Sequence, residues 1–292
     1  MNKLVIAAVF LFFVCAVVGC HRAHETAGSD NPRLPPNVRL QDVTFYSAAL
    51  GRNMQYRVIL PTFVPPSRKL PVVYLLHGGG GGYRDWSNYS DVAQFAERGL
   101  VLVRPEGNSS YYTNSATVPA DRYKDFIVKD LIADVEAKFP AASGRNNRAI
   151  AGVSMGRFGA VKIALKYPQL YFFAGGLSPA LDIPTRAFSL KRIGQWRFHS
   201  SIFGPAPSQT RRENDPYALA RGSDAATTPY LFLSCGEQEG LLTANQKFAA
   251  VLKERDFRYE FRTAPGDHNW KQWSGQVAAL FQSLNAHLNQ PI

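Results

Sequence analysis

Five short apolar runs constrain the fold of this chain more than any other feature of its sequence. A strand with one solvated face alternates apolar and polar residues, whereas a strand covered on both faces is apolar throughout. The runs are Pro71–Leu76, Leu100–Val103, Ala149–Val153, Phe172–Leu177 and Tyr230–Cys235. They predict the buried strands of a mostly parallel sheet.

Helical spacing of apolar residues separates several of these runs. The four helical patterns lie at 126–139, 160–167, 248–252 and 277–288. Strands that alternate with helices in this way predict an α/β fold with helices on both faces of the sheet. Val38–Phe45 and Met54–Leu60 alternate instead and flank Gly51, which predicts an antiparallel hairpin at one edge, and Arg258–Arg262 predicts another edge strand.

One long segment, from Leu181 to Thr228, shows little periodicity and is rich in Arg, Ser, Pro and Gly. We expect an irregular excursion over the top of the sheet, where it could shape a substrate entrance. We call this segment the excursion.

The first residues have the character of an export signal. Lys3 precedes an uncharged apolar run from Leu4 to Gly19, which is shorter than a membrane-spanning helix needs. The run ends at Cys20 and resembles the lipobox of bacterial lipoproteins, in which that Cys is lipidated; ordinary signal cleavage, with Cys20 incidental, is the alternative. We therefore expect a signal over 1–20, a flexible tether over 21–37, one domain over 38–292, and a location in the cell envelope, at the periplasm or cell surface.

Charge and cysteine content exclude several classes of protein. The chain has 33 Lys and Arg against 22 Asp and Glu, a net charge of +11. Its cations are scattered and form no nucleic-acid-binding motif, so a basic surface facing anionic envelope material is the better interpretation. Cys235 is the single cysteine of the expected domain, which leaves no internal disulfide and no cysteine zinc site.

The candidate catalytic nucleophile lies in the segment Gly152-Val153-Ser154-Met155-Gly156. This G-x-S-x-G pattern lies between a predicted buried strand and a predicted helix, the context that makes it a nucleophile elbow. Small residues are needed on both sides of Ser154 because the turn brings neighbouring backbone close. The alternative is a tight turn whose serine only caps a helix.

A glycine run, Gly78–Gly82, follows His77 and the strand that ends at Leu76. Consecutive glycines cost backbone entropy, but they let main-chain N–H groups approach a ligand, as an oxyanion hole requires. We expect the N–H groups of Gly79 and Met155 to form that hole; a flexible turn is the alternative. His77 is expected to organise the loop rather than to titrate.

A serine nucleophile requires a base and an acid that orients it. His77 is assigned to the glycine loop, and of the other histidines His268 alone follows a predicted strand in a loop. The chain order of such triads places the acid before the histidine. Glu237, Glu239 and Asp267 are the candidates. Asp267 is poorly placed as a direct neighbour of His268, and Glu239 reaches further over the sheet than Glu237, so we favour Glu239.

These motifs together resemble the esterase branch of the α/β-hydrolases, which includes S-formylglutathione hydrolases, tributyrin and feruloyl esterases and mycolyltransferases. The matching segments are 75–78, 149–156, 158–160, 235–239 and 268–273, and the likeness runs from about Val38 to Leu288. The resemblance implies an α/β-hydrolase fold and selects Glu239 as the acid. Two positions depart from most relatives: Arg157 replaces a second Gly, and Glu239 replaces Asp, as in the mycolyltransferases.

The sequence thus predicts a serine carboxylesterase with the triad Ser154, His268 and Glu239, needing no metal or organic cofactor. Its expected partners are a small-molecule or carbohydrate ester and, through the lipid anchor, a membrane. An acyltransferase that uses a sugar or glycerol acceptor and a noncatalytic binding protein are the alternatives.

Two further expectations concern the substrate. Arg157 could contact an anionic substrate or pair with an acid of the excursion; a solvent-facing or locally paired arginine is the alternative. Five aromatic side chains could stack on a sugar or phenolic ring, although packing explains them equally well. They are Trp86, Tyr111, Tyr112, Trp196 and Trp270.

Overall fold

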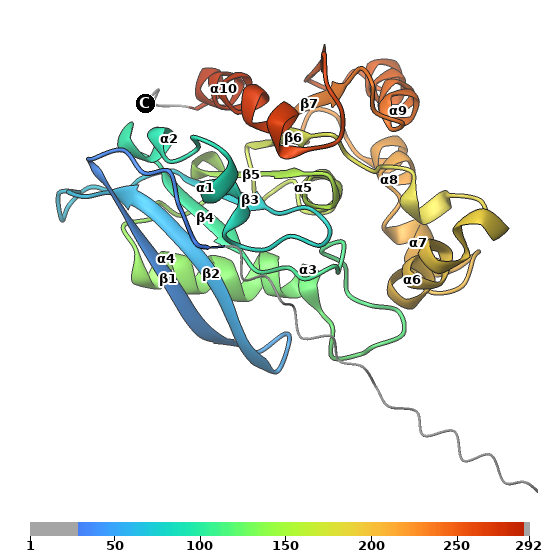
Figure 1. The fold of residues 1–292 in the computed structure, drawn as a ribbon, viewed down its shortest axis with the longest axis horizontal. Coiled ribbons are helices and arrows are strands. Elements are labelled where there is room, and N and C mark those ends of the chain that lie inside the picture. Colours follow the sequence, from blue (N-terminus) through green and yellow to red (C-terminus); the bar gives the residue numbers. More distant parts are fainter. Residues whose placement is uncertain (1–28, 289–292) are drawn as a thin grey trace, which may run out of the picture. The chain divides into compact units, whose positions relative to one another are not determined.

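Eight strands form a single sheet in the part of the chain that the computed structural model describes, residues 29–288. The predicted signal and Cys20 lie outside these residues. The strands are β1 (Val38–Ser47), β2 (Arg52–Pro61), β3 (Val72–Leu76), β4 (Val101–Pro105), β5 (Arg148–Val153), β6 (Phe173–Leu177), β7 (Tyr230–Gly236) and β8 (Tyr259–Ala264). Their order across the sheet is β1-β2-β4-β3-β5-β6-β7-β8 (Figure 1).

The pairing of the strands confirms the predicted α/β architecture. β1 and β2 form an antiparallel hairpin with Val38 opposite Pro61, and β2 runs antiparallel to β4. Every other neighbouring pair from β4 to β8 is parallel. β8 is the far edge strand, and none of its residues is fully buried, which agrees with its alternating sequence.

Helices cover both faces of the sheet. They are α1 (Asp85–Tyr89), α2 (Gln94–Glu97), α3 (Tyr123–Asp125), α4 (Ile132–Lys138), α5 (Met155–Lys166), α6 (Ile193–Phe203), α7 (Gln209–Glu213), α8 (Pro216–Gly222), α9 (Leu242–Glu254) and α10 (Trp270–Ala286). A π-helical turn, Phe126–Leu131, joins α3 to α4, so the predicted helix before Pro140 is nearly continuous.

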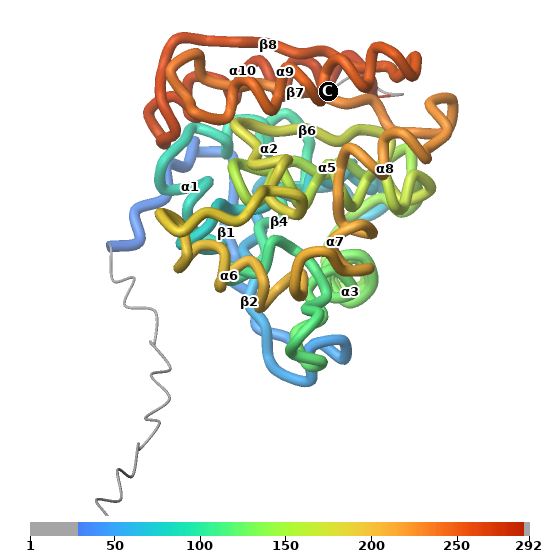
Figure 2. The backbone as a smooth tube through the Cα atoms, turned by 90° about the vertical axis from the view of Figure 1, so that its right-hand side faces the viewer, coloured from blue at the N-terminus to red at the C-terminus, as the bar shows by residue number. Residues whose placement is uncertain are grey.

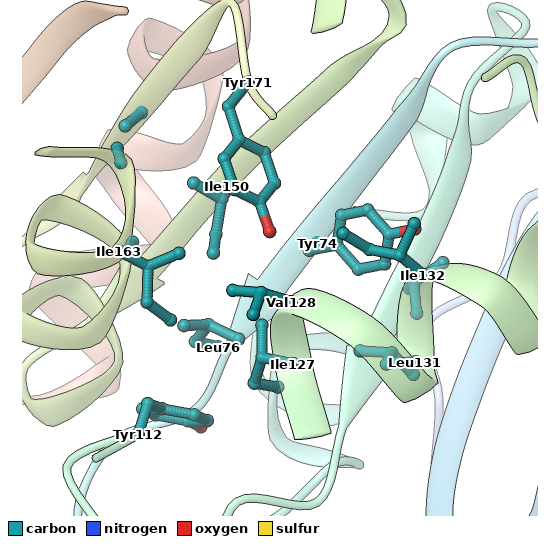
Figure 3. Packing of buried hydrophobic residues seen from close by; sticks show 14 of the residues in the cluster. Tyr74, Leu76, Tyr112, Ile127, Val128, Leu131, Ile132, Ile150, Ile163 and Tyr171 are labelled. Carbon is teal, nitrogen blue, oxygen red and sulfur yellow. The ribbon is translucent and has the colours of Figure 1, made fainter. Parts of the chain in front are cut away.

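Two hydrophobic layers result because neighbouring residues of a strand point to opposite faces. In β3, Tyr74 and Leu76 belong to the layer with α4, α5 and α9, whereas Val73 and Leu75 belong to the layer with α1, α2 and α10. Figure 3 shows the first layer, with Leu76 beside Ile127 of the π-helical turn and near Ile163 of α5. The second layer includes the parallel stack of Phe95 on Phe281, with ring centroids 4.1 Å apart.

The excursion differs from the expectation, since most of it is helical. It contains the 3-10 turns Ile183–Thr185 and Leu190–Arg192, followed by α6, α7 and α8. The helices were hidden in the sequence because they are short and because α6 leaves large apolar residues such as Ile193 exposed. Figures 1 and 2 place α6 at the surface of the folded unit.

The described end of the expected tether makes specific contacts with the domain. The Arg33 amide donates to the Ser87 carbonyl at 2.8 Å, and the Asn37 side chain donates to Glu97 at 2.8 Å. Between residues 29 and 288, no helix combines the length and apolar character that a membrane span requires.

Candidate functional site

The elbow at Ser154 is held by close contact between β5 and α5. Ser154 has φ 52° and ψ −116°, a conformation that costs a residue with a side chain free energy. A Cβ atom on Gly156 would overlap the Leu76 carbonyl, and one on Gly152 would overlap the backbone of Gly156. Both positions therefore require glycine, for the steric reason that the motif suggested.

A chain of hydrogen bonds joins the three predicted triad residues. Ser154 Oγ lies 2.8 Å from His268 Nε2, and His268 Nδ1 lies 2.9 Å from Glu239 Oε2. An ionised carboxylate can only accept, so Nδ1 carries the proton and, in a neutral ring, Nε2 is left to accept from the serine hydroxyl. The elbow after β5, the turn after β7 and the loop after β8 supply one residue each.

Glu239 is buried and tightly held. Its Oε1 accepts hydrogen bonds from the Ser178 hydroxyl and from the Gly236 amide, the latter at 2.9 Å. Burial alone would raise the pKa of Glu239, but the hydrogen bonds from His268, Ser178 and Gly236 together lower it below its ordinary value. The carboxylate is thus ionised at neutral pH and able to orient the imidazole.

The other two candidate acids lie elsewhere. Glu237 is exposed and accepts from the Thr263 hydroxyl at 3.3 Å. Asp267 accepts from the backbone amide of His268 at 2.7 Å, so it organises the loop and does not reach the ring.

The glycine loop lies against the elbow. A Cβ atom on Gly78 would be 3.6 Å from Ser154 Cβ, and one on Gly79 would be 4.0 Å from Met155 Cβ. Met155 is the first residue of α5, so its N–H has no partner within the helix. His77 anchors the loop, with Nδ1 2.8 Å from the Gly78 carbonyl and Nε2 accepting from the Gly107 amide at 2.9 Å.

The structure contradicts the expectation that Arg157 pairs with an acid of the excursion, and also the alternative that it faces solvent. Its side chain is completely buried, and its Nη1 donates to the Ser234 carbonyl at 2.7 Å. Among the described residues, its Nε and Nη2 have no hydrogen-bond partner. Burial lowers the pKa of Arg157 to about 9, opposed by the charge of Glu239, so the guanidinium is still a cation at neutral pH beneath the site.

Sequence reasoning missed Ser178 and the role of Trp273. Ser178 has φ +54°, and its amide donates at 2.8 Å to the same Ser234 carbonyl that Arg157 contacts. Its hydroxyl accepts from Trp273 Nε1 at 2.9 Å while donating to Glu239. The only sequence signal was that Ser178 directly follows a predicted strand, as the residues of such sites do.

Lys162 was also missed because it lies within a helical pattern. It is completely buried, and its ammonium donates to the carbonyls of Tyr111 and Tyr112 at 3.1 and 2.7 Å and to Thr113 Oγ1. It therefore ties the loop after β4, in which Tyr111 and Tyr112 both have positive φ, to α5.

Two of the five aromatic candidates cannot stack on a substrate. Trp86 and Tyr112 are completely buried, and Trp86 Nε1 donates to the Leu76 carbonyl at 3.1 Å. Tyr111, Trp196 and Trp270 are partly exposed. The described residues contain no cluster of His, Cys, Asp and Glu placed to bind a metal ion.

Comparison with known proteins finds esterases, an acyltransferase and a serine hydrolase among those similar to this chain. An acetyl esterase of Caldicellulosiruptor saccharolyticus is 26% identical over 261 residues, which cover 84% of this chain and 98% of that protein. The diacylglycerol acyltransferase/mycolyltransferase Ag85A of Mycobacterium tuberculosis is 24% identical and covers 98% of this chain and 92% of its own. Among solved structures, FphF, a fluorophosphonate-binding serine hydrolase of Staphylococcus aureus, superposes with a TM-score of 0.73 at 25% identity, covering 87% of this chain and 99% of its own.

The model of the family described as "Putative esterase" matches residues 47–284, which include the elbow and both other residues of the hydrogen-bonded chain. The fold, with its eight-stranded sheet and N-terminal hairpin, is that of the α/β-hydrolases. This chain therefore belongs to that esterase family and is a serine hydrolase that acts on ester bonds.

Proposed function

We propose that the protein is a serine carboxylesterase in which Ser154, His268 and Glu239 act as the catalytic triad. The observation that carries the proposal is the unbroken hydrogen-bonded chain from Ser154 Oγ through the imidazole to the buried carboxylate of Glu239. The support for an ester substrate is the membership of the family and the acetyl esterase among its relatives. We expect a small-molecule or carbohydrate ester with a short acyl group.

In the first half-reaction, Ser154 Oγ bonds to the carbonyl carbon of the ester while His268 Nε2 takes the hydroxyl proton. The carbonyl oxygen becomes an oxyanion, which the N–H groups of Gly79 and Met155 stabilise. Glu239 stabilises the imidazolium through Nδ1. When the intermediate collapses, the bond to the leaving oxygen breaks, and His268 returns the proton to the departing alcohol.

In the second half-reaction, water replaces the alcohol. His268 takes a proton from the water as its oxygen bonds to the acyl carbon, and it then protonates Ser154 Oγ as the acyl–serine bond breaks. The carboxylic acid leaves, and the enzyme is regenerated with no net change in protons or electrons on the triad. Besides the ester and water, each step uses only Ser154, His268, Glu239 and the two backbone N–H groups.

The triad is tested by comparing two carboxylate variants on a soluble acetate ester. Glu239→Gln removes the charge that orients His268, so kcat should fall by up to about 10⁴, the loss seen when such an acid is replaced. Glu237→Gln is the matched control and should stay within about threefold of the parent, with folding checked by circular dichroism. Ser154→Ala should abolish labelling by a fluorophosphonate probe; retained labelling, or an active Glu239→Gln beside an inactive Glu237→Gln, would contradict the assignment.

The buried Arg157 should act on the site through Glu239. The cation of Arg157 favours the ionised form of the Glu239 carboxylate. That form orients His268 at pH values above the pKa of Glu239, and its effect is lost as the pH falls through this pKa. Arg157→Met removes the cation, so the pH at which the Glu239 carboxylate protonates, followed by its carbon-13 chemical shift, should rise by about one unit, the size expected for one nearby charge. Arg157→Lys keeps a cation and should raise this pH less. An unshifted titration of Glu239 in both variants would show that Arg157 only packs.

Acyl transfer is a second candidate, because the match to the mycolyltransferase extends over 98% of this chain. The acid of the proposed triad, Glu239, is also a glutamate, the residue type that the resemblance to the mycolyltransferases implies at this position. In that case an alcohol attacks the acyl-enzyme in place of water. Incubation with an acetate ester and added glycerol or glucose should give free acetate as the main product. Acylated glycerol or sugar exceeding free acetate would favour the transferase.

The proposed location is the cell envelope, with the protein held by a lipid on Cys20. The support is the apolar run of residues 4–19, which ends at this cysteine. Cys20→Ser should shift the protein from the membrane to the soluble fraction or block its maturation, whereas Cys15→Ser, inside the leader, should change neither. Because one acyl chain binds only marginally, a stable anchor requires more than one. Unchanged fractionation and processing of Cys20→Ser would reject the lipoprotein assignment.

A further inference from the structure

The excursion contains an unusual concentration of positive charge. From Ile183 to Arg212 it has six Lys and Arg residues and no Asp or Glu. Arg186 is neutralised by Asp182, with the closest atoms 2.6 Å apart. Lys191, Arg192 and Arg197 are exposed, and none of them has an ion-pair partner among the described residues. These three cations are thus available to an external anion.

Large apolar side chains are exposed among the same cations. Phe188, Leu190, Ile193 and Phe198 are 55, 77, 47 and 42% exposed. They account for four of the nine large hydrophobic side chains that are exposed in the described part of the chain, although they fall within eleven residues. Scattered exposed apolar residues are ordinary, but a group of this density indicates a surface that is covered in use.

A cavity of about 280 Å³ lies within this surface. Arg186, Arg192 and Arg211 line it together with the rings of Phe188 and Trp196, and no described residue of its wall is acidic. Arg211 is fixed by hydrogen bonds to the carbonyls of Gly204 and Pro184, at 2.9 and 2.8 Å. The wall therefore carries two arginines that have no acidic partner among the described residues, Arg192 and Arg211, beside apolar rings.

We propose that residues 188–198 and this cavity form a docking surface for an anionic phospholipid membrane. Exposed Phe, Leu and Ile side chains insert at the boundary between headgroups and acyl chains, while neighbouring Lys and Arg bind phosphates; this combination is the signature of an interfacial helix. Charge complementarity favours a lipid surface over a protein partner. Residues 188–198 contain no acidic side chain that could pair with a basic partner, and their cations lie among apolar side chains, as an anionic membrane requires. The arginine-lined cavity receives a headgroup phosphate.

Docking here would bring a membrane close to the elements that hold the proposed active site. The excursion begins three residues after Ser178, which donates to Glu239. It packs on α5 through Phe203, whose ring centroid lies 5.9 Å from that of Phe158. Tyr111 bridges the two parts, with its hydroxyl 3.2 Å from His199 Nε2. The inference does not depend on the lipid at Cys20, because the surface is built from described residues of the domain alone.

The test measures, in the full chain, whether a dye at one chosen position enters a lipid environment. Cys15→Ser and Cys20→Ser remove the reactive and lipidated cysteines of the leader, and Cys235 is completely buried. Ile193→Cys then carries an environment-sensitive NBD dye, and Phe63→Cys, at a side chain 77% exposed outside the excursion, carries it in the control. We expect vesicles of phosphatidylcholine with phosphatidylglycerol to shift the emission at position 193 to the blue and to leave position 63 unchanged.

Charge variants separate the docking surface from net charge. Replacing Lys191, Arg192 and Arg197 by Gln in the dye-labelled protein should weaken partitioning to these vesicles about a hundredfold, given the contribution of each cation at an anionic surface. Replacing the exposed Arg39, Lys69 and Lys253 by Gln lowers the net charge equally and should change partitioning less than threefold. Hydrolysis of a soluble acetate ester, unchanged in both, checks folding.

Several results would overturn the proposal. They are no response at position 193, an equal response at position 63, an equal response to pure phosphatidylcholine, and equal losses in the two charge variants. A blue shift that appears without vesicles as the protein concentration rises would assign the surface to a second copy of the chain instead. The expected response must also weaken as the salt concentration increases.

Discussion

The close packing of α5 on β5 is the constraint on which the rest of the structure depends. The turn between them brings Gly156 against the Leu76 carbonyl and holds Ser154 in a strained conformation, with φ 52°. A conformation of this kind persists only when its surroundings over-determine it. The two hydrophobic layers supply that constraint, because β5 is completely buried and hydrogen-bonded on both sides, to β3 and to β6.

A set of buried polar groups extends this constraint to the remaining residues of the site. The Ser234 carbonyl accepts from both Ser178 and Arg157, Ser178 contacts Glu239, and Glu239 contacts His268. Such networks rigidify a site when all members are satisfied, and each unsatisfied member costs free energy. Two nitrogens of Arg157 find no partner in the part of the chain that the structure describes, and burial without a partner costs free energy that hydrophobic packing offsets.

Much of this arrangement could be predicted from the sequence, for physical reasons that differ between elements. The buried strands were recognisable because coverage on both faces demands continuous apolar runs, and the α/β fold followed. Arg157 could not be placed, because a cation at the start of a helix looks exposed, whereas here it is completely buried and donates to the Ser234 carbonyl of β7. Ser178 and Lys162 act through contacts between residues far apart in the chain, which periodicity does not encode. The helices of the excursion were missed because they are short and because α6 exposes apolar residues instead of burying them.

The position of β8 has a consequence for how the site is lost. The loop that carries His268 follows this strand, which pairs with β7 on one side and, within residues 29–288, has no neighbouring strand on the other. Edge strands open by local fluctuations at a lower free energy than central strands do. Partial opening at this edge would withdraw the imidazole while Ser154, in the centre of the sheet, kept its geometry. The molecule then has a folded but inactive form, which differs from the active form only in the position of the sheet edge formed by β8. Inactivation by heat can therefore precede global unfolding.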